Sequence, residues 1–241
     1  MTIKKNNAIQ LIQDDVERMS ELILQQLREL DNFLSAPELE IETGKIEEFS
    51  KTEKEIDNLE IKISDEFINI ISLHKPVASD LRKIIACYRL SINLERIGDI
   101  SLKILRILSE MKPQSIINVY MDEISNMFTI TNHMVEKSVL SFLNSDIEYA
   151  IWTLKNDDIV DKINKKMIKK ILKKNTKNFQ GPQTISTFIN IKTIVSNIER
   201  IADHSTNIAE SSIYYLKGED VRHSDIRTIK GLEDNPSDQS D

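Results

Sequence analysis

Turn-forming residues and cysteine are scarce in this chain. The 241 residues include only five glycines and five prolines, below the usual shares of about 7% and 5%, which excludes most all-β folds with their many tight turns. The single cysteine, Cys87, excludes an intrachain disulfide and a cysteine-rich zinc module and favours a reducing compartment. No segment approaches the roughly 18 continuous apolar residues that indicate a membrane helix. We therefore expect a cytoplasmic protein that does not span a membrane.

The charge balance excludes another class of partner. The chain has 32 basic and 39 acidic residues, for a net charge of −7, whereas a general nucleic-acid binder normally carries a basic excess. Hydrophobic residues make up 40% of the chain, which is enough to form a core. We expect a folded protein that does not bind nucleic acid.

Hydrophobic residues recur at helical spacing between the few glycines and prolines, which tend to interrupt helices. Steps of three or four residues separate the apolar positions, as in Ile56, Leu59, Ile63, Phe67 and Ile70, a pattern typical of amphipathic helices. Alternation with a period of two, which is typical of strands, is not sustained anywhere. The sequence therefore predicts an all-α fold of six long helices.

The two halves of the chain are copies of one another. Residues 95–99 read Glu-Arg-Ile-Gly-Asp, and residues 199–203, 104 positions later, read Glu-Arg-Ile-Ala-Asp. The same offset relates an earlier acid-x-x-x-acid pair in each half, Glu53 with Asp57 and Asp157 with Asp161. Four carboxylates that keep their type and spacing across a duplication indicate a shared role.

The breakers divide the duplicated chain near its middle. Lys112 and Pro113 mark the boundary, and Pro76 and Pro182 are each expected to begin a helix, since the first turn of a helix tolerates a missing amide. We predict two tandem, duplicated three-helix bundles followed by a polar mobile tail, at residues 1–112, 113–218 and 219–241.

Each half places two pairs of carboxylates on two neighbouring helices. Acids four residues apart lie on one face of a helix, and like charges about 6 Å apart repel by roughly 3 kcal/mol at an effective dielectric constant of 20. A metal ion, a basic side chain or a proton would relieve this repulsion. All-oxygen ligands suit magnesium, manganese, calcium or iron, and zinc also accepts carboxylates. The candidate metal ligands are Glu53, Asp57, Glu95, Asp99, Asp157, Asp161, Glu199 and Asp203.

Solvated helix faces are the alternative explanation for these acids. A single acid-x-x-x-acid step most often lies on such a face. Four steps at matched positions of a duplication favour a binding site instead.

A run of lysines forms a second charged surface. Eight lysines between residues 162 and 177 follow one another at steps of three and one, which places them on one helical face. A solvated face is the simpler interpretation, and a docking surface for an acidic partner or for anionic headgroups is the alternative. We take Lys166, Lys170 and Lys173 as candidate partner-binding residues.

The sequence carries no signature of catalysis. It contains no Ser-His-Asp grouping, no glycine-rich phosphate loop and no dinucleotide fingerprint. The Glu-x-x-His pairs of ferritin-like di-iron bundles are also missing. We expect no enzymatic activity. A carboxylate-bridged metal enzyme or iron-storage bundle is the first alternative, and a metal-free helical scaffold is the second.

Four blocks of residues resemble the PhoU family of phosphate-transport regulators. They are Ala-Ser-Asp-Leu-Arg-Lys-Ile at 78–84, Leu-Glu-Arg-Ile-Gly-Asp at 94–99, Glu-Arg-Ile-Ala-Asp-His-Ser-Thr-Asn-Ile-Ala-Glu at 199–210 and Lys-Gly-Glu-Asp-Val-Arg-His at 217–223. The resemblance implies a six-helix protein of two three-helix bundles that binds multinuclear metal at the acidic motifs. One departure is that the second half lacks the Asp-Leu-Arg block, so any role of Asp80 and Arg82 is not duplicated.

The resemblance also implies a function and partners. Members of the family restrain phosphate uptake and the phosphate-starvation response, with the phosphate ABC transporter and a sensor histidine kinase as partners. We expect a metal-binding regulatory adaptor that contacts the transporter ATPase subunit and the kinase, and we further expect a homodimer. The bound ions are expected to be divalent or trivalent, and the sequence does not distinguish iron, zinc, manganese and magnesium.

Overall fold

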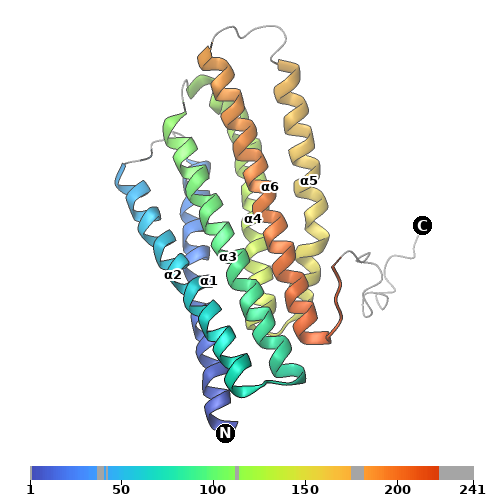
Figure 1. Cartoon of the computed structure of the whole chain (residues 1–241). Helices are drawn as coiled ribbons and strands as arrows, with labels where there is room; N and C mark the ends of the chain where they lie inside the picture. The colour runs from blue at the N-terminus through green and yellow to red at the C-terminus, as the bar shows by residue number, and fades with distance from the viewer. Residues whose placement is uncertain (1, 37–40, 42, 112–113, 175–181, 223–241) are drawn as a thin grey trace, which may run out of the picture.

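Six long helices run up and down the length of the protein (Figure 1). The computed structural model describes residues 2–36, 41, 43–111, 114–174 and 182–222. The helices are α1 (Thr2–Ser35), α2 (Thr43–His74), α3 (Ala78–Glu110), α4 (Gln114–Leu143), α5 (Ile147–Lys174) and α6 (Pro182–Lys217). No strand occurs among the described residues, which confirms the predicted all-α fold.

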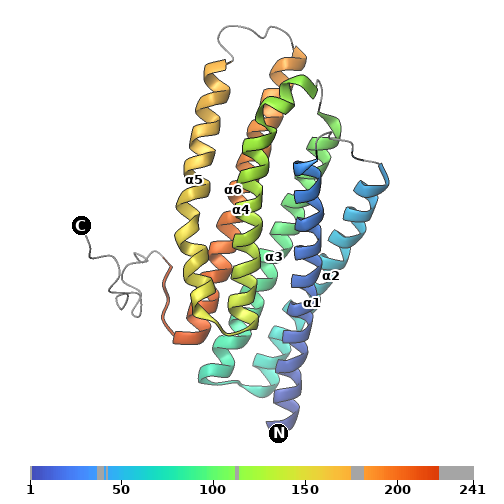
Figure 2. The same cartoon turned by 180° about the vertical axis from the view of Figure 1, so that it is seen from behind.

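The helices form two bundles of three. Helices α1, α2 and α3 contact one another, as do α4, α5 and α6. The bundles meet through equivalent helices, α1 against α4 and α3 against α6 (Figures 1 and 2). The predicted tandem arrangement is therefore confirmed.

The helix bounds follow the predicted repeat. The starts of α2 and α5 are 104 residues apart (43 and 147), as are those of α3 and α6 (78 and 182). The ends of α1 and α4 are 108 residues apart (35 and 143). The difference arises because the connection before α5 is four residues shorter than the connection before α2.

The turn between α2 and α3 differs in detail from the prediction. Pro76 does not begin a helix, because α3 starts two residues later at Ala78. Lys75 and Ala78 have positive φ angles of 43° and 49°, and Val77 between them is extended. These residues form a tight turn that folds α3 back along α2. Pro182, in contrast, is the first residue of α6 as predicted.

One continuous hydrophobic core joins the two bundles. Fully buried residues from the first bundle, such as Ile56 and Ile97, belong to the same cluster as Ile198 and Ile201 of the second. A side chain added at Gly98 would lie 3.1 Å from Ile23 Cδ1 on α1. Glycine at this position therefore lets α3 approach α1 closely.

The chain continues beyond α6 as a short described segment. Gly218, with φ of 74°, ends the helix, and its amide donates to the Tyr214 carbonyl at 2.9 Å. Val221 then packs into a small apolar cluster with Ala209 and Ile213. The rest of the predicted tail, residues 223–241, lies outside the described residues, as does the predicted boundary at 112/113. No helix among the described residues is long and apolar enough to cross a membrane.

Candidate metal centres

The structure gathers the predicted acids into two clusters at equivalent places. The first acidic cluster lies between α2 and α3, and the second lies between α5 and α6. The first consists of Glu53, Asp57, Glu95 and Asp99, and the second of Asp157, Asp161, Glu199 and Asp203.

Buried residues within the motifs determine where the acids point. Ile56 on α2 and Ile97 on α3 are fully buried, and both lie between the two acids of their pair. Asp57 follows Ile56 directly and points about 100° away from it, whereas Glu95 and Asp99 each lie two residues from Ile97 and point about 160° away from it. Burial of these isoleucines therefore turns the acids out of the core, towards the edge of the α2–α3 contact. In the second bundle Val160 and Ile201, with 1% and no exposure, have the same positions.

The acids are neither fully solvated nor part of the core. In the first cluster Glu53, Asp57 and Glu95 are half-buried, and Asp99 is exposed. The equivalent acids of the second cluster repeat this pattern, with Asp203 as the exposed one. The solvated alternative therefore describes one acid of each cluster well and the other three poorly.

Burial and mutual repulsion disfavour ionisation in the first cluster. Partial burial raises the pKa of Glu53, as do the charge of Asp57 and a hydrogen bond with Asp99. The pKa of Asp57 is raised by burial and by Asp99. Burial also raises the pKa of Glu95, with further contributions from Asp99, Asp57 and Glu60. Ionisation of an acid on α2 therefore depends on the charge of the acids on α3, and the reverse holds as well.

The second cluster shows the same effect more strongly. Burial raises the pKa of Asp157 to about 6, and the next largest contribution comes from the charge of Asp203. The pKa of Asp203 is raised by burial, then by Glu199 and Asp161. The acids of α5 and α6 therefore also influence one another's ionisation.

The donor set of each cluster fits a hard metal ion in its chemistry. Raised pKa values mark carboxylates that lack a compensating positive charge, and a cation would supply it. In the second bundle, the buried Asn164 Oδ1 has no hydrogen-bond partner. Asn164 lies three residues after Asp161, on the same helix face. The side chains nevertheless do not converge as placed, because no three acidic, histidine or cysteine side chains among the described residues come together around one point. Binding would require side-chain rotations that bring the carboxylates of one cluster together.

Two residues of these surroundings were not predicted from the sequence. Glu60 contributes to the raised pKa of Glu95, and Asn164 occupies the equivalent position in the second half. The repeat offset of 104 could have found this pair. The pair does not stand out in the sequence because the two side chains differ in charge.

The lysine surface on α5 is partly occupied by ion pairs within the protein. Lys165 donates to Asp161 Oδ2 at 2.9 Å. Lys170 pairs with Glu123 on α4 and lies 5.2 Å from the centre of the Tyr120 ring. Lys166 and Lys173 are exposed. Their predicted role in partner binding stays a prediction.

His204 lies beside the second cluster in sequence but points elsewhere. It is buried, and its Nδ1 lies 3.0 Å from Asn93 Oδ1 on α3. The amide oxygen can only accept, so Nδ1 carries the proton. Burial, together with Arg96 and Arg200, lowers the pKa of His204 to about 4. The residue therefore links the two bundles as a neutral imidazole.

The unduplicated Asp-Leu-Arg block makes structural contacts. Asp80 accepts a hydrogen bond from Lys5 on α1 at 2.6 Å. Arg82 lies beside Gly218, where an added side chain would be 3.5 Å from the Arg82 guanidinium carbon. The start of α3 thus contacts the end of α6, which gives these residues a role in only one half.

Comparison with known proteins identifies the family. The model of the PhoU domain matches the sequence twice, over residues 16–108 and 124–212. The chain belongs to the PhoU domain family. The two PhoU matches start 108 residues apart and end 104 apart, as expected from the shorter connection before α5.

Relatives and solved structures agree with this assignment. A phosphate-specific transport system accessory protein PhoU homolog from Pseudomonas aeruginosa is 28% identical over 225 residues, 93% of this chain and 90% of that protein. The crystal structure of PhoU from Pseudomonas aeruginosa has a TM-score of 0.76 at 26% identity, covering 89% of this chain and 99% of that one. The phosphate transport system regulatory protein PhoU from Streptococcus pneumoniae, at 20% identity and a TM-score of 0.66 over 90% of this chain and 99% of that one, shares the fold.

Proposed function

We propose that this protein is a regulatory adaptor that restrains phosphate uptake and phosphate-starvation signalling. The observation that supports the proposal is the match of both halves to the PhoU domain, together with relatives named as accessory proteins of phosphate-specific transport. The adaptor acts in the cytoplasm, has no catalytic activity, and contacts the ATPase subunit of the phosphate ABC transporter and a sensor histidine kinase.

Affinity capture from phosphate-replete and phosphate-starved cells tests this proposal. The full-length protein should recover the transporter ATPase and the kinase, in amounts that differ between the two conditions. Recovery of neither partner in either condition would contradict the adaptor function. Size-exclusion chromatography with light scattering tests the expected homodimer in the same preparation.

The second part of the proposal is that each acidic cluster binds divalent or trivalent metal ions. Glu53 and Asp57 from α2, with Glu95 and Asp99 from α3, would supply oxygen ligands in the first bundle, and their equivalents would do so in the second. A bound ion supplies positive charge that keeps the clustered carboxylates ionised. Because the ligands come from two helices, they would tie those helices together.

Elemental analysis tests metal binding and identifies the ion. Protein purified without chelator should contain iron, zinc, manganese or magnesium, and chelator should remove it. Protein that holds no metal before or after reloading would support the metal-free scaffold. An oxygen-consumption assay with ferrous iron separates an adaptor from a metal enzyme or iron-storage bundle, since only the latter two would consume oxygen.

The third part of the proposal is that the lysine surface of α5 contacts an acidic partner. Its support is the concentration of lysines on one helix of a chain whose net charge is −7. Charge complementarity of this kind speeds association more than it strengthens the final complex. Charge reversal of Lys166, Lys170 and Lys173 should therefore slow partner association and weaken its dependence on salt.

A matched control separates docking from net charge. Lys51, Lys54 and Lys103 are exposed on the first bundle, and their reversal changes the net charge by the same amount. Lys170 has an internal partner in Glu123, so the single Lys166→Glu variant provides a test that leaves this ion pair intact. Equal recovery of both partners by wild type and the reversed proteins at low salt would contradict docking at this surface.

A further inference from the structure

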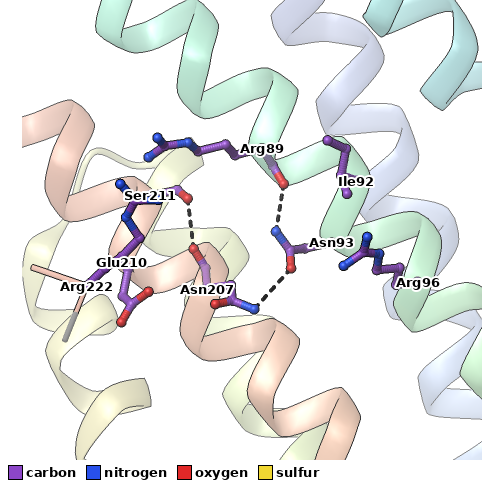
Figure 3. Close-up of a pocket in the computed structure, with 8 residues that line it drawn as sticks. All are labelled: Arg89, Ile92, Asn93, Arg96, Asn207, Glu210, Ser211 and Arg222. Carbon is purple, nitrogen blue, oxygen red and sulfur yellow. Dashed lines mark hydrogen bonds between the residues drawn. The ribbon is translucent and has the colours of Figure 1, made fainter. Parts of the chain in front are cut away.

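A polar pocket opens between the two halves of the protein, on the seam between α3 and α6. The acidic clusters lie on different seams, between α2 and α3 and between α5 and α6. The pocket has a volume of about 260 Å³ (Figure 3), below the roughly 300–1,000 Å³ of sites for drug-sized ligands. It is lined by Arg89, Ile92, Asn93, Arg96, Asn207, Glu210, Ser211 and Arg222.

Two of its three arginines form no salt bridge with the described residues. Neither Arg89 nor Arg96 forms a salt bridge with any residue in the described part of the chain. The guanidinium of Arg89 instead lies 5.3 Å from the centre of the Tyr214 ring, which holds it in place by cation–π attraction. Their donors are therefore available for a ligand.

The third arginine is held at the pocket by the segment after α6. Val221 is buried against Ala209 and Ile213, which fixes the backbone beside Arg222. Asp220 accepts from Arg222 Nε at 2.8 Å and also from Nη2. This pairing leaves Nη1 of the guanidinium for other contacts.

A hydrogen-bond network orders the floor of the pocket (Figure 3). The Asn93 side chain donates to the Arg89 carbonyl at 2.8 Å, and its oxygen accepts from Asn207 at 3.4 Å. His204 donates to the same oxygen. The Ser211 hydroxyl donates to the Asn207 carbonyl at 2.8 Å. These hydrogen bonds hold α3 and α6 together at the pocket, so the arginines extend from an ordered backbone.

We propose that this pocket binds inorganic phosphate. Guanidinium groups match phosphate oxygens with paired, charge-assisted hydrogen bonds, and three arginines against Glu210 and Asp220, the partner of Arg222, leave the pocket with a net positive charge. Glu210 supplies selectivity, because hydrogen phosphate keeps a proton at neutral pH that a carboxylate can accept. Sulfate and the dianion of a phosphate ester have no such proton. The proposal extends the proposed function by naming a small molecule that the adaptor binds, and it can be tested without any partner.

Isothermal titration of phosphate into the full-length protein tests the site. The titration is run with chelator present, so that phosphate cannot bind through metal at the acidic clusters. Wild type should bind phosphate at least tenfold more tightly than sulfate or glycerol 3-phosphate. Arg96→Gln should weaken phosphate binding at least tenfold, and Glu210→Gln should reduce the preference over sulfate.

Arg200→Gln is the matched control. Arg200 occupies the position equivalent to Arg96, 104 residues later, and does not line the pocket. Its loss should change phosphate affinity less than twofold. Both arginines are exposed, and circular dichroism verifies that both variants fold.

Three outcomes would overturn the proposal. The first is that wild type binds no phosphate at about 10 mM ligand, because affinity weaker than this would not serve a functional site. The second is an equal loss of affinity in Arg96→Gln and Arg200→Gln. The third is phosphate binding that is seen only in a parallel titration without chelator. The last would assign phosphate to a metal rather than to the arginines. Failure to capture the transporter ATPase would contradict the adaptor function and leave this result unaffected.

Discussion

Helices α2 and α5 carry equivalent acids in different surroundings. Asp161 on α5 pairs with Lys165 at 2.9 Å, whereas the position equivalent to Lys165 on α2 is Ile61, which is 57% exposed. Glu60 on α2 adds a fifth acid at the position where α5 has the neutral Asn164. The duplication thus kept the acids and changed the groups that balance them.

The two clusters differ in what opposes their charge. In the first, Arg106 acts to lower the pKa of Glu53, against burial and the neighbouring acids. In the second, Lys165 pairs with Asp161 while burial and neighbouring acids raise the pKa of Asp157 to about 6. Equivalent ligand positions therefore need not give equal affinity for a cation. We expect two sites that share ligands and differ in strength.

The largest expected effect is the loss of one site at a time. Replacing Glu95 with Ala and Asp99 with Asn should lower bound metal by the share of the first cluster, roughly half, and leave the second cluster loaded. The matched variant, with Glu199→Ala and Asp203→Asn, should do the reverse. Elemental analysis of both proteins measures this.

The two double variants also test whether the acids are ligands at all. Unchanged metal content in both would show that they are not. Without metal, neither variant should be less stable than wild type, since each removes like charges that repel one another. Urea denaturation of the chelated proteins checks this expectation.

The next effect concerns pH and Asp157. The pKa of this carboxyl is near 3.8 in the unfolded chain and about 6 in the folded protein, so the folded state binds the proton more tightly. The resulting penalty on stability is absent below about pH 4, grows as the pH rises towards 6, and is complete at pH 7. Asp157→Asn should therefore stabilise the chelated protein at pH 7 by on the order of 1 kcal/mol, after allowance for screening by water.

At pH 4 the same substitution should have almost no effect, because the wild-type carboxyl is then protonated when folded. Thermal unfolding of both proteins at the two pH values measures the difference. Glu53→Gln, at the equivalent position of the first cluster, is the control and should show a smaller gain. An equal gain from Asp157→Asn at both pH values would contradict the raised pKa.

Much of the fold was predictable because the repeat and the helical period reinforce one another. Ile56 and Ile63, placed by period, are fully buried, and the helix starts 104 residues apart follow the sequence offset. The start of α3 was not predictable, because it depends on a turn in which Lys75 and Ala78 adopt positive φ. Neither residue type signals that conformation.

The candidate sites were only partly predictable for a related reason. The matched spacing located the acids, but the balance of charge around them depends on contacts across helices, such as that between Lys170 and Glu123. The pocket between α3 and α6 was not predicted because two of its arginines come from α3, in the first half of the chain, and the third comes from the segment after α6. Arg89 and Arg222 are far apart in sequence and meet only because Val221 packs back onto α6.

The smallest expected effect comes from exchanging Lys165 and its equivalent, Ile61. Lys165 donates to Asp161 from an exposed position, and such a solvent-exposed ion pair adds little to the stability of a helix. Its positive charge nevertheless occupies a carboxylate that a metal ion would need. Lys165→Ile should therefore raise the metal affinity of the second cluster, and Ile61→Lys should lower that of the first.

The two substitutions are best compared in proteins in which only one cluster can bind metal. Lys165→Ile is introduced into the protein that carries Glu95→Ala and Asp99→Asn. Ile61→Lys is introduced into the protein that carries Glu199→Ala and Asp203→Asn. Removing or adding one positive charge beside the site should change the affinity for metal roughly fivefold, in opposite directions in the two proteins. Because Lys165 is exposed, the change should shrink at high salt. If metal titrations show the same affinity with and without Lys165, the lysine moves away at little cost, and any difference between the clusters must come from burial and from the other charges, such as Glu60 and Arg106.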